Sequence, residues 1–125
     1  MRVVLDTSVL LGPDPGLIDA DVAICAVSLA ELHFGVLVAA SPAVRAERLR
    51  RLGIIEKTFD ALPVDDAVAR EYGRLAAALA GRQPKARAAD LLIAATAAAH
   101  QATLWTRNPN DLAGLEGLVD LHQSA

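Results

Sequence analysis

The chain has 125 residues, of which 54% are hydrophobic and 22% charged, with one cysteine and 3% aromatic residues. This composition excludes a disordered chain and a disulfide-rich scaffold, and the length fits one domain over residues 1–125 with a sizeable core of its own. The 12 Lys and Arg against 15 Asp and Glu give a net charge of −3, which argues against a uniformly basic nucleic-acid binder.

Short apolar runs alternate with helical segments along the chain. The strands are expected at residues 2–5, 22–25, 61–64, 103–106 and 118–121. The helices are expected at residues 28–40, 42–52 with a continuation over 54–59, 65–81 and 86–101. Parallel strands need crossover helices, so this alternation predicts an α/β fold with a parallel sheet covered on both faces.

Capping residues set several of these predicted boundaries. Ser28 is expected to cap the first helix, and Ser41 before Pro42 the second. Gly53 meets the end of the second helix, and Gly81 ends the third.

The single Cys25 lies in an apolar run of residues 22–27, so a buried and unreactive thiol in a reducing compartment is expected. The N-terminus has no signal-peptide core, and no apolar stretch reaches the length of a membrane span. We therefore expect a cytoplasmic protein with no membrane contact.

Asp6 directly follows the first predicted strand and precedes the hydroxyl residues Thr7 and Ser8. In parallel sheets ligands collect at the carboxyl ends of the strands, so the Asp6 carboxylate is expected to project into that crevice. The alternative is that Asp6, Thr7 or Ser8 only caps the following turn.

Glu31 is the most ambiguous acid of the chain. Ser28-Leu29-Ala30-Glu31 has the pattern of a capping box, in which the serine and the glutamate each bind a backbone N–H of the other. By itself the spacing favours this structural role. A glutamate early in a helix that follows the second strand is nevertheless also close to the strand ends.

Asp90 lies in the first turns of a helix that is apolar on nearly every face. A buried carboxylate must be protonated, paired or bound to a metal. The structural alternative is a salt bridge to Arg87 or Arg82.

Asn108 precedes Pro109 and has the pattern of a helix N-cap, which Asp111 completes three residues later. The functional alternative places the Asn108 amide oxygen or the Asp111 carboxylate in the same crevice as Asp6.

The combination is more informative than any one of these residues. Three carboxylates and a further oxygen ligand, each at a strand end or a helix start, form the donor set that Mg²⁺ or Mn²⁺ requires. Such a site can activate water and stabilise the leaving oxygen in phosphodiester hydrolysis. His33, His100 and His122 have no partner at metal-ligand spacing and are expected to be packing or surface residues.

Ten of the twelve cations lie in the middle of the chain. They are Arg45, Arg48, Arg50, Arg51, Lys57, Arg70, Arg74, Arg82, Lys85 and Arg87. If metal ions neutralise the acids, this basic segment is left to face a polyanion. Solvated helix faces are the other interpretation.

Four segments place a polar group at a strand end or a helix start, and they are Asp6-Thr7-Ser8, Ser28-x-x-Glu31, Ala89-Asp90-Leu91-Leu92-Ile93-Ala94-Ala95 and Thr106-Arg107-Asn108-x-x-Asp111. In order and spacing, and over essentially the whole chain, they resemble the PIN-domain ribonucleases, specifically the VapC toxins of type II toxin-antitoxin pairs.

The resemblance implies a PIN-like three-layer α/β/α fold with about five parallel strands, and a homodimer. It implies a Mg²⁺- or Mn²⁺-dependent endoribonuclease acting on RNA, with tRNA or rRNA as the family's usual targets, held inactive by a cognate VapB-type antitoxin. Carried over to this chain, Asp6 and Asp90 are the principal metal ligands and Glu31 is the third acid. Pro13 and Pro15 interrupt the segment in which the family usually has a longer first helix.

The resemblance also implies that Asn108, with or without Asp111, completes the site. Thr7 or Ser8, together with Thr106, is then expected to orient the carboxylates by hydrogen bonding. Asn108 stands where many family members have an aspartate, so one firmly held metal is expected rather than two.

Other functions stay open at this point. One is a catalytically weak PIN domain that only binds RNA or its antitoxin, and another is a related DNA-directed nuclease, although the chain has no added helical arch or DNA clamp. Val36, Leu37, Leu49 and Leu52 offer either a groove for a partner helix or, as the pattern favours, core residues.

Overall fold

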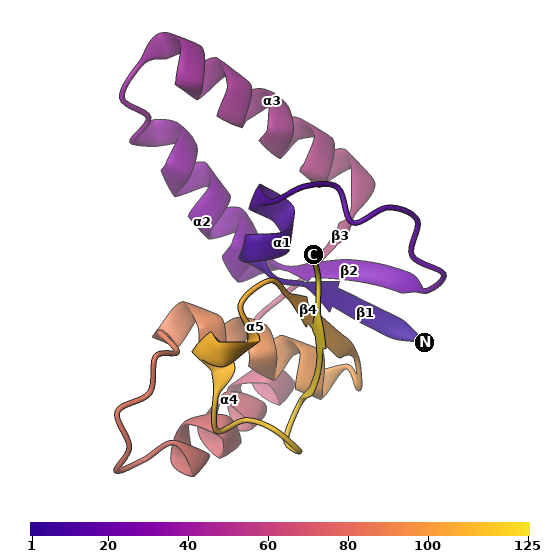
Figure 1. Ribbon diagram of the computed structural model, residues 1–125, viewed down its shortest axis with the longest axis vertical. Helices are drawn as coiled ribbons and strands as arrows, with labels where there is room; N and C mark the ends of the chain where they lie inside the picture. The colour runs from indigo at the N-terminus through magenta and orange to yellow at the C-terminus, as the bar shows by residue number, and fades with distance from the viewer.

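The computed structural model describes residues 1–125 and has five parallel strands in one sheet, in the order β3-β2-β1-β4-β5 (Figure 1). The strands are β1 (Arg2–Leu5), β2 (Asp21–Cys25), β3 (Asp60–Leu62), β4 (Thr103–Thr106) and β5 (Asp120–Gln123). The central strand β1 pairs with β2 on one side and with β4 on the other. The predicted α/β class with a parallel sheet of five strands is confirmed.

Helices cover both faces of the sheet (Figure 1). They are α1 (Thr7–Leu11), α2 (Ala26–Leu37), α3 (Pro42–Thr58), α4 (Asp66–Ala78), α5 (Ala88–Ala99) and the short 3₁₀ helix η1 (Pro109–Leu112). No helix combines the length and the apolar character that crossing a membrane requires.

The two faces of β1 belong to different hydrophobic clusters, because successive side chains of a strand point to opposite faces. Val4 packs in a cluster that includes Leu75 of α4 and Ile93 of α5. Val3 and Leu5 pack in a second cluster with residues of α1, α2 and α3. Burial on both faces explains why β1 is an uninterrupted apolar run.

Residues 7–11 form a short helix, α1, which the sequence did not predict. Five residues are too few to show a helical hydrophobic period. Val9 and Leu10 are buried in the second cluster, so tertiary packing holds this single turn in place.

The start of α2 corrects the prediction that Ser28 is an N-cap. The helix begins at Ala26, and its N-cap is Cys25, whose sulfur accepts from the Val27 N–H at 3.4 Å. Ser28 is completely buried inside the first turn. Cys25 is buried and forms no disulfide, as predicted.

The helix α3 is continuous to Thr58, so the predicted interruption at Gly53 is wrong. A glycine inside a helix costs about 1 kcal/mol relative to alanine. The buried neighbours Leu52 and Ile55 anchor the helix on both sides of it. The predicted cap at Ser41 is confirmed, since its hydroxyl accepts from the Val44 N–H at 3.2 Å.

Other boundaries move by two or three residues. The predicted end of α4 at Gly81 is wrong, because the helix stops at Ala78, and Gly81 has a φ of 78° in the turn that follows. The predicted range 86–101 of α5 shortens to 88–99, and Gln101 leaves the helix with a φ of 52°. The edge strand β3 ends before Pro63, which has no N–H for a ladder, and β5 lies two residues later than expected.

The helices α2 and α3 form a hairpin that projects beyond the sheet (Figure 1). On it, Val36 and Leu52 are buried, as the core interpretation expects. Leu37 and Leu49 are exposed by 71% and 57%, so that interpretation is wrong for these two residues. The outer face of the hairpin is therefore partly apolar.

Candidate active site

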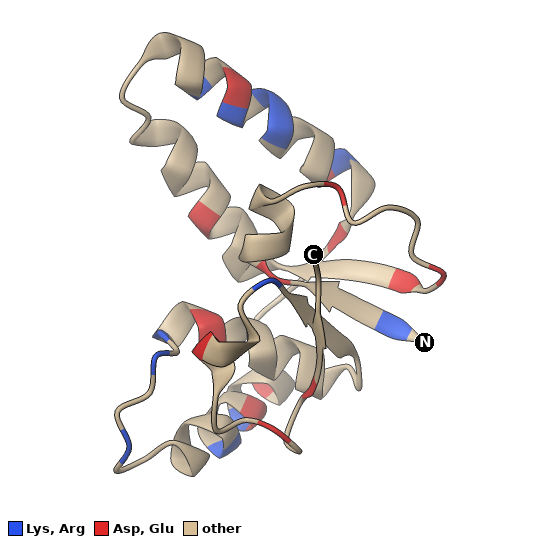
Figure 2. Ribbon diagram, viewed as in Figure 1, with Lys and Arg blue, Asp and Glu red and all other residues tan.

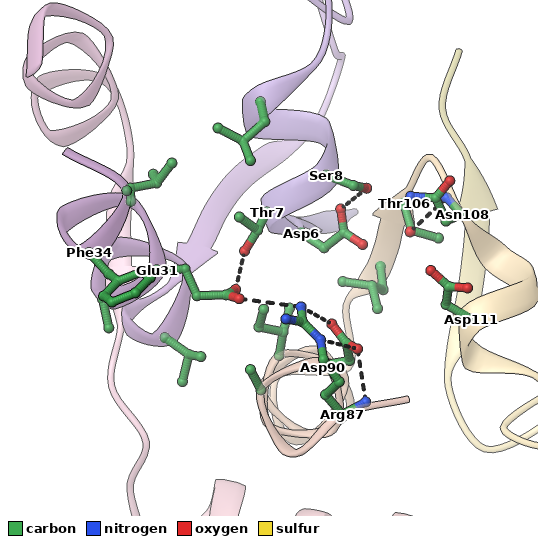
Figure 3. Close-up of a pocket in the computed structure, with 18 of the residues that line it drawn as sticks. Asp6, Thr7, Ser8, Glu31, Phe34, Arg87, Asp90, Thr106, Asn108 and Asp111 are labelled. Atoms are coloured by element: carbon green, nitrogen blue, oxygen red, sulfur yellow. Dashed lines mark hydrogen bonds and ion pairs between the residues drawn. The ribbon is translucent and has the colours of Figure 1, made fainter. Parts of the chain in front are cut away.

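A cleft of about 950 Å³ lies at the edge of the sheet where β1 and β4 end. Every polar residue singled out as a site candidate lines it, namely Asp6, Thr7, Ser8, Glu31, Asp90, Thr106, Asn108 and Asp111 (Figure 3). Segments far apart in the sequence therefore meet at one place, as the topology of parallel strands requires.

Asp6 both caps a helix and faces the cleft. Its Oδ1 accepts from the Val9 N–H at 3.1 Å, as an N-cap of α1, and from the Ser8 hydroxyl at 2.6 Å. Ser8 in turn accepts from the backbone N–H of Arg107 at 3.0 Å, which ties α1 to the segment after β4. These bonds all fall on Oδ1 and leave the second carboxylate oxygen without a protein donor. The two interpretations of Asp6 are thus compatible.

The capping-box interpretation of Glu31 is wrong. Because α2 begins at Ala26, Glu31 lies in its second turn and points into the cleft (Figure 3). Its Oε1 accepts from the Thr7 hydroxyl at 2.7 Å, and the Ser28 hydroxyl lies 3.0 Å from that same Thr7 oxygen. A chain of hydroxyl groups therefore orients this carboxylate instead of a helix end.

Asp90 is the third residue of α5 and is 26% exposed at its side chain, less buried than the apolar helix suggested. Its Oδ2 accepts from the backbone N–H of Arg87 at 2.9 Å, which satisfies one free donor of the helix start. The predicted alternative of a salt bridge is observed with Arg87, at 3.3 Å, and not with Arg82.

Arg87 links two of the acids. Its Nη2 lies 3.3 Å from Asp90 Oδ1 and 3.4 Å from Glu31 Oε2 (Figure 3). The hydrogen bond and the charge of Asp90, followed by the charge of Glu31, raise the pKa of the Arg87 guanidinium, which stays protonated. The sequence named Arg87 as a pairing partner of Asp90 and as one of the basic residues. Its contact with Glu31 joins residues 56 positions apart.

The segment after β4 forms the opposite wall of the cleft. Asn108 is the N-cap residue of η1, and its backbone N–H donates to the Thr106 hydroxyl at 3.1 Å. Thr106 therefore binds backbone rather than the carboxylate that it was expected to orient. The backbone carbonyl of Asn108 accepts from the Asp111 N–H at 3.0 Å. The side chains of Asn108 and Asp111 have no hydrogen bond within the protein.

The donor chemistry of the cleft suits a hard divalent cation. Four carboxylates and one amide contribute oxygen, and no histidine or cysteine lines the cleft. In their present positions, however, no three acidic, histidine or cysteine side chains come close enough to hold one ion. Arg87 supplies the positive charge between Glu31 and Asp90 instead.

The histidines lie outside this site, as expected. His33 approaches Glu56 at 3.5 Å on the surface of the hairpin. His122 packs against the Trp105 ring at a centroid distance of 4.2 Å, and His100 contacts the Arg2 side chain.

Residues 3–115 match the PIN domain family. Ribonuclease VapC5 of Mycobacterium tuberculosis is 42% identical over 124 residues, which cover 94% of this chain and 90% of that protein. This chain belongs to the VapC group of the PIN-domain family. Ribonuclease VapC4 of the same organism is 32% identical and covers 91% of both chains.

Two solved structures share this fold. VapBC-5 of M. tuberculosis, a member of the VapBC family of toxin-antitoxin systems, superposes with a TM-score of 0.84 at 41% identity, covering 98% of this chain and 97% of that one. FitAcB of Neisseria gonorrhoeae gives a TM-score of 0.78 at 29% identity, covering 97% and 96%.

Four basic residues line this PIN-domain cleft together with its acids. Figure 2 shows basic positions on α3 and in the loop before α5. Arg48 and Arg51 reach the cleft from α3 and donate to the carbonyls of Gly35 and Gly12. Lys85 and Arg87 reach it from the loop before α5, and Lys85 has no ion pair or hydrogen bond. The sequence predicted Arg48, Arg51 and Lys85 only as members of its basic segment.

Proposed function

We propose that this chain is the toxin of a type II toxin-antitoxin pair and a metal-dependent endoribonuclease that acts in the cytoplasm. The whole of residues 1–125 then serves as one nuclease domain. The observation that carries this proposal is the meeting of acids from four separate segments in one cleft of a VapC-type fold. Both curated relatives described above carry the name ribonuclease.

Mg²⁺ or Mn²⁺ is the proposed cofactor, and Asp6, Asp90 and Glu31 are its proposed ligands. Asn108 or Asp111, whose side chains have no other partner, completes the set. A divalent ion supplies Lewis acidity toward a phosphodiester and makes water a better nucleophile at neutral pH.

The chain's own residues prepare this chemistry before any ligand binds. Ser8 and the Val9 N–H hold one oxygen of Asp6, so the other is directed to the cleft. Thr7 holds Glu31 in the same way. Fixed orientation of ligand oxygens lowers the reorganisation that binding requires.

The basic rim is the proposed contact for the RNA backbone. Lys and Arg side chains on two sides of the cleft can neutralise phosphates on either side of the scissile bond. Groove shape selects the RNA, and loops of tRNA or rRNA are the proposed targets because unpaired bases are accessible there.

A VapB-type antitoxin is the proposed inhibitor, since the solved relative VapBC-5 is a member of a toxin-antitoxin family. The exposed apolar residues Leu37 and Leu49 of the α2–α3 hairpin are suited to a protein partner. We further propose that the toxin is a homodimer.

A second candidate function is a PIN domain that binds RNA or its antitoxin without cutting. The absence of three converging acids and the neutral side chain of Asn108 favour it. Its discriminating property is metal binding, because a module without catalysis has no need for Mn²⁺.

The test is cleavage of total RNA by the purified, antitoxin-free protein with Mg²⁺ or Mn²⁺, with chelator, and with the D6N variant. We expect discrete fragments that disappear with chelator and with D6N. Intact RNA in every condition, from protein shown to be folded by circular dichroism, contradicts the nuclease and supports the binding module.

A further inference from the structure

The Arg87 side chain is held loosely between its two acids. Its contacts with Asp90 and Glu31 measure 3.3 Å and 3.4 Å, longer than the roughly 2.7–2.9 Å of a strong charge-assisted hydrogen bond. The guanidinium side chain is also 70% exposed. Long bonds and free access to solvent make this contact easy to exchange.

The two acids, by contrast, are partly buried. The Glu31 and Asp90 side chains are 25% and 26% exposed, and they come from different helices. Two carboxylates in such a position repel each other unless a positive charge stands between them. Arg87 is the cation that stands there in this structure.

The backbone and the side chain of Arg87 act independently. Its N–H donates to Asp90 at 2.9 Å and completes the start of α5 whatever the side chain is. A substitution at position 87 therefore removes the guanidinium and leaves this backbone bond in place.

We propose that Arg87 is an exchangeable counter-ion of the acidic pair. Its single positive charge offsets part of the negative charge of Glu31 and Asp90 in the metal-free protein, and it leaves them when a divalent cation binds. With Arg87 between the two acids, no three acids converge on one point. The released guanidinium remains at the mouth of the cleft, where a phosphate of the RNA can accept from it.

Because this inference presupposes the metal-dependent nuclease proposed above, the test measures metal binding in the absence of RNA. Mn²⁺ is titrated into the full chain by calorimetry in the wild type, R87Q and K85Q. Lys85 is the matched control, since it lines the same cleft from the same loop and carries the same charge without touching a carboxylate.

If Arg87 competes with Mn²⁺ for the two acids, R87Q should bind Mn²⁺ about tenfold more tightly than the wild type. K85Q should change the Mn²⁺ affinity by less than about twofold, because it only removes a nearby charge. R87K, which keeps the charge but has no bidentate fork, is expected between R87Q and the wild type. A ligand that binds only the folded state raises Tm according to its affinity, so Mn²⁺ should also raise the Tm of R87Q more than that of the wild type.

The outcomes separate the two proposals. Equal Mn²⁺ affinities of R87Q and K85Q, with clear binding to the wild type, overturn the role of Arg87 and leave the nuclease standing. Weaker binding by R87Q also overturns it, because Arg87 then supports the metal rather than competing with it. No Mn²⁺ binding to any variant overturns both proposals together.

Discussion

The two sides of the cleft hold their acids in different ways. Asp6 is oriented by Ser8 and Val9, its own near neighbours in sequence, at 2.6 Å and 3.1 Å. Glu31 and Asp90 are brought together only by tertiary packing, and Arg87 bridges them with longer contacts. Hydrogen bonds prearrange the acids on both sides, since Thr7 holds Glu31 at 2.7 Å and the Arg87 N–H holds Asp90 at 2.9 Å. The Glu31–Asp90 side differs in having a counter-ion, the Arg87 guanidinium, which we propose can leave.

The largest expected effect comes from removing one acid on each side. We expect D6N and D90N each to lower RNA cleavage by more than about a hundredfold, because each loses a charged oxygen ligand. Asparagine is a good N-cap, so D6N should keep its Tm. The control D19N changes an exposed aspartate outside the cleft and should cleave normally. Full activity of both D6N and D90N would contradict the assignment of the site.

A smaller effect is expected when the support of Glu31 is removed. T7V keeps the size of the side chain but deletes the hydroxyl that holds Glu31 at 2.7 Å. We expect a loss of about tenfold to a hundredfold in kcat/KM for an RNA fragment, the range found for residues that orient metal ligands. T58V removes a threonine hydroxyl at the exposed end of α3 and serves as the matched control. If T7V and T58V have the same activity, Thr7 does not position Glu31 for catalysis.

Removing the hydroxyl that holds Asp6 should lower kcat/KM less than removing the one that holds Glu31. S8A removes the 2.6 Å hydrogen bond to Asp6, but the Val9 N–H still holds the same oxygen. We therefore expect a loss in kcat/KM of about three- to tenfold, below that of T7V. A larger loss in S8A than in T7V would reverse the comparison and make Asp6 the less firmly held acid.

The smallest effect is expected at the rim. K85Q removes one cation that has no partner in the protein, so its charge is available to a phosphate. We expect RNA affinity to fall by a few fold and the slope of log K against log salt to decrease by about one. K57Q, which removes a lysine of α3 outside the cleft, is the control. An unchanged salt slope in K85Q would exclude Lys85 from the RNA contact.

Much of the site follows from local patterns. A buried apolar run followed by Asp6 identifies the end of a central strand, and the parallel topology then brings the other strand ends to the same edge. The positions of Asn108 and Ser41 as N-caps follow equally from their neighbours. These features depend on a few adjacent residues, so the sequence by itself determines them.

Tertiary structure decided the rest. The short helix α1 exists because Val9 and Leu10 are buried by segments distant in sequence. The start of α2 at Ala26 turned Glu31 from a predicted cap into a cleft residue bound to Thr7, 24 positions away. The pairing of Arg87 with Glu31 and the exposure of Leu37 likewise depend on how the helices pack. Local patterns favour a hydrogen bond with the nearest backbone, and only the packed fold shows which distant partner is closer.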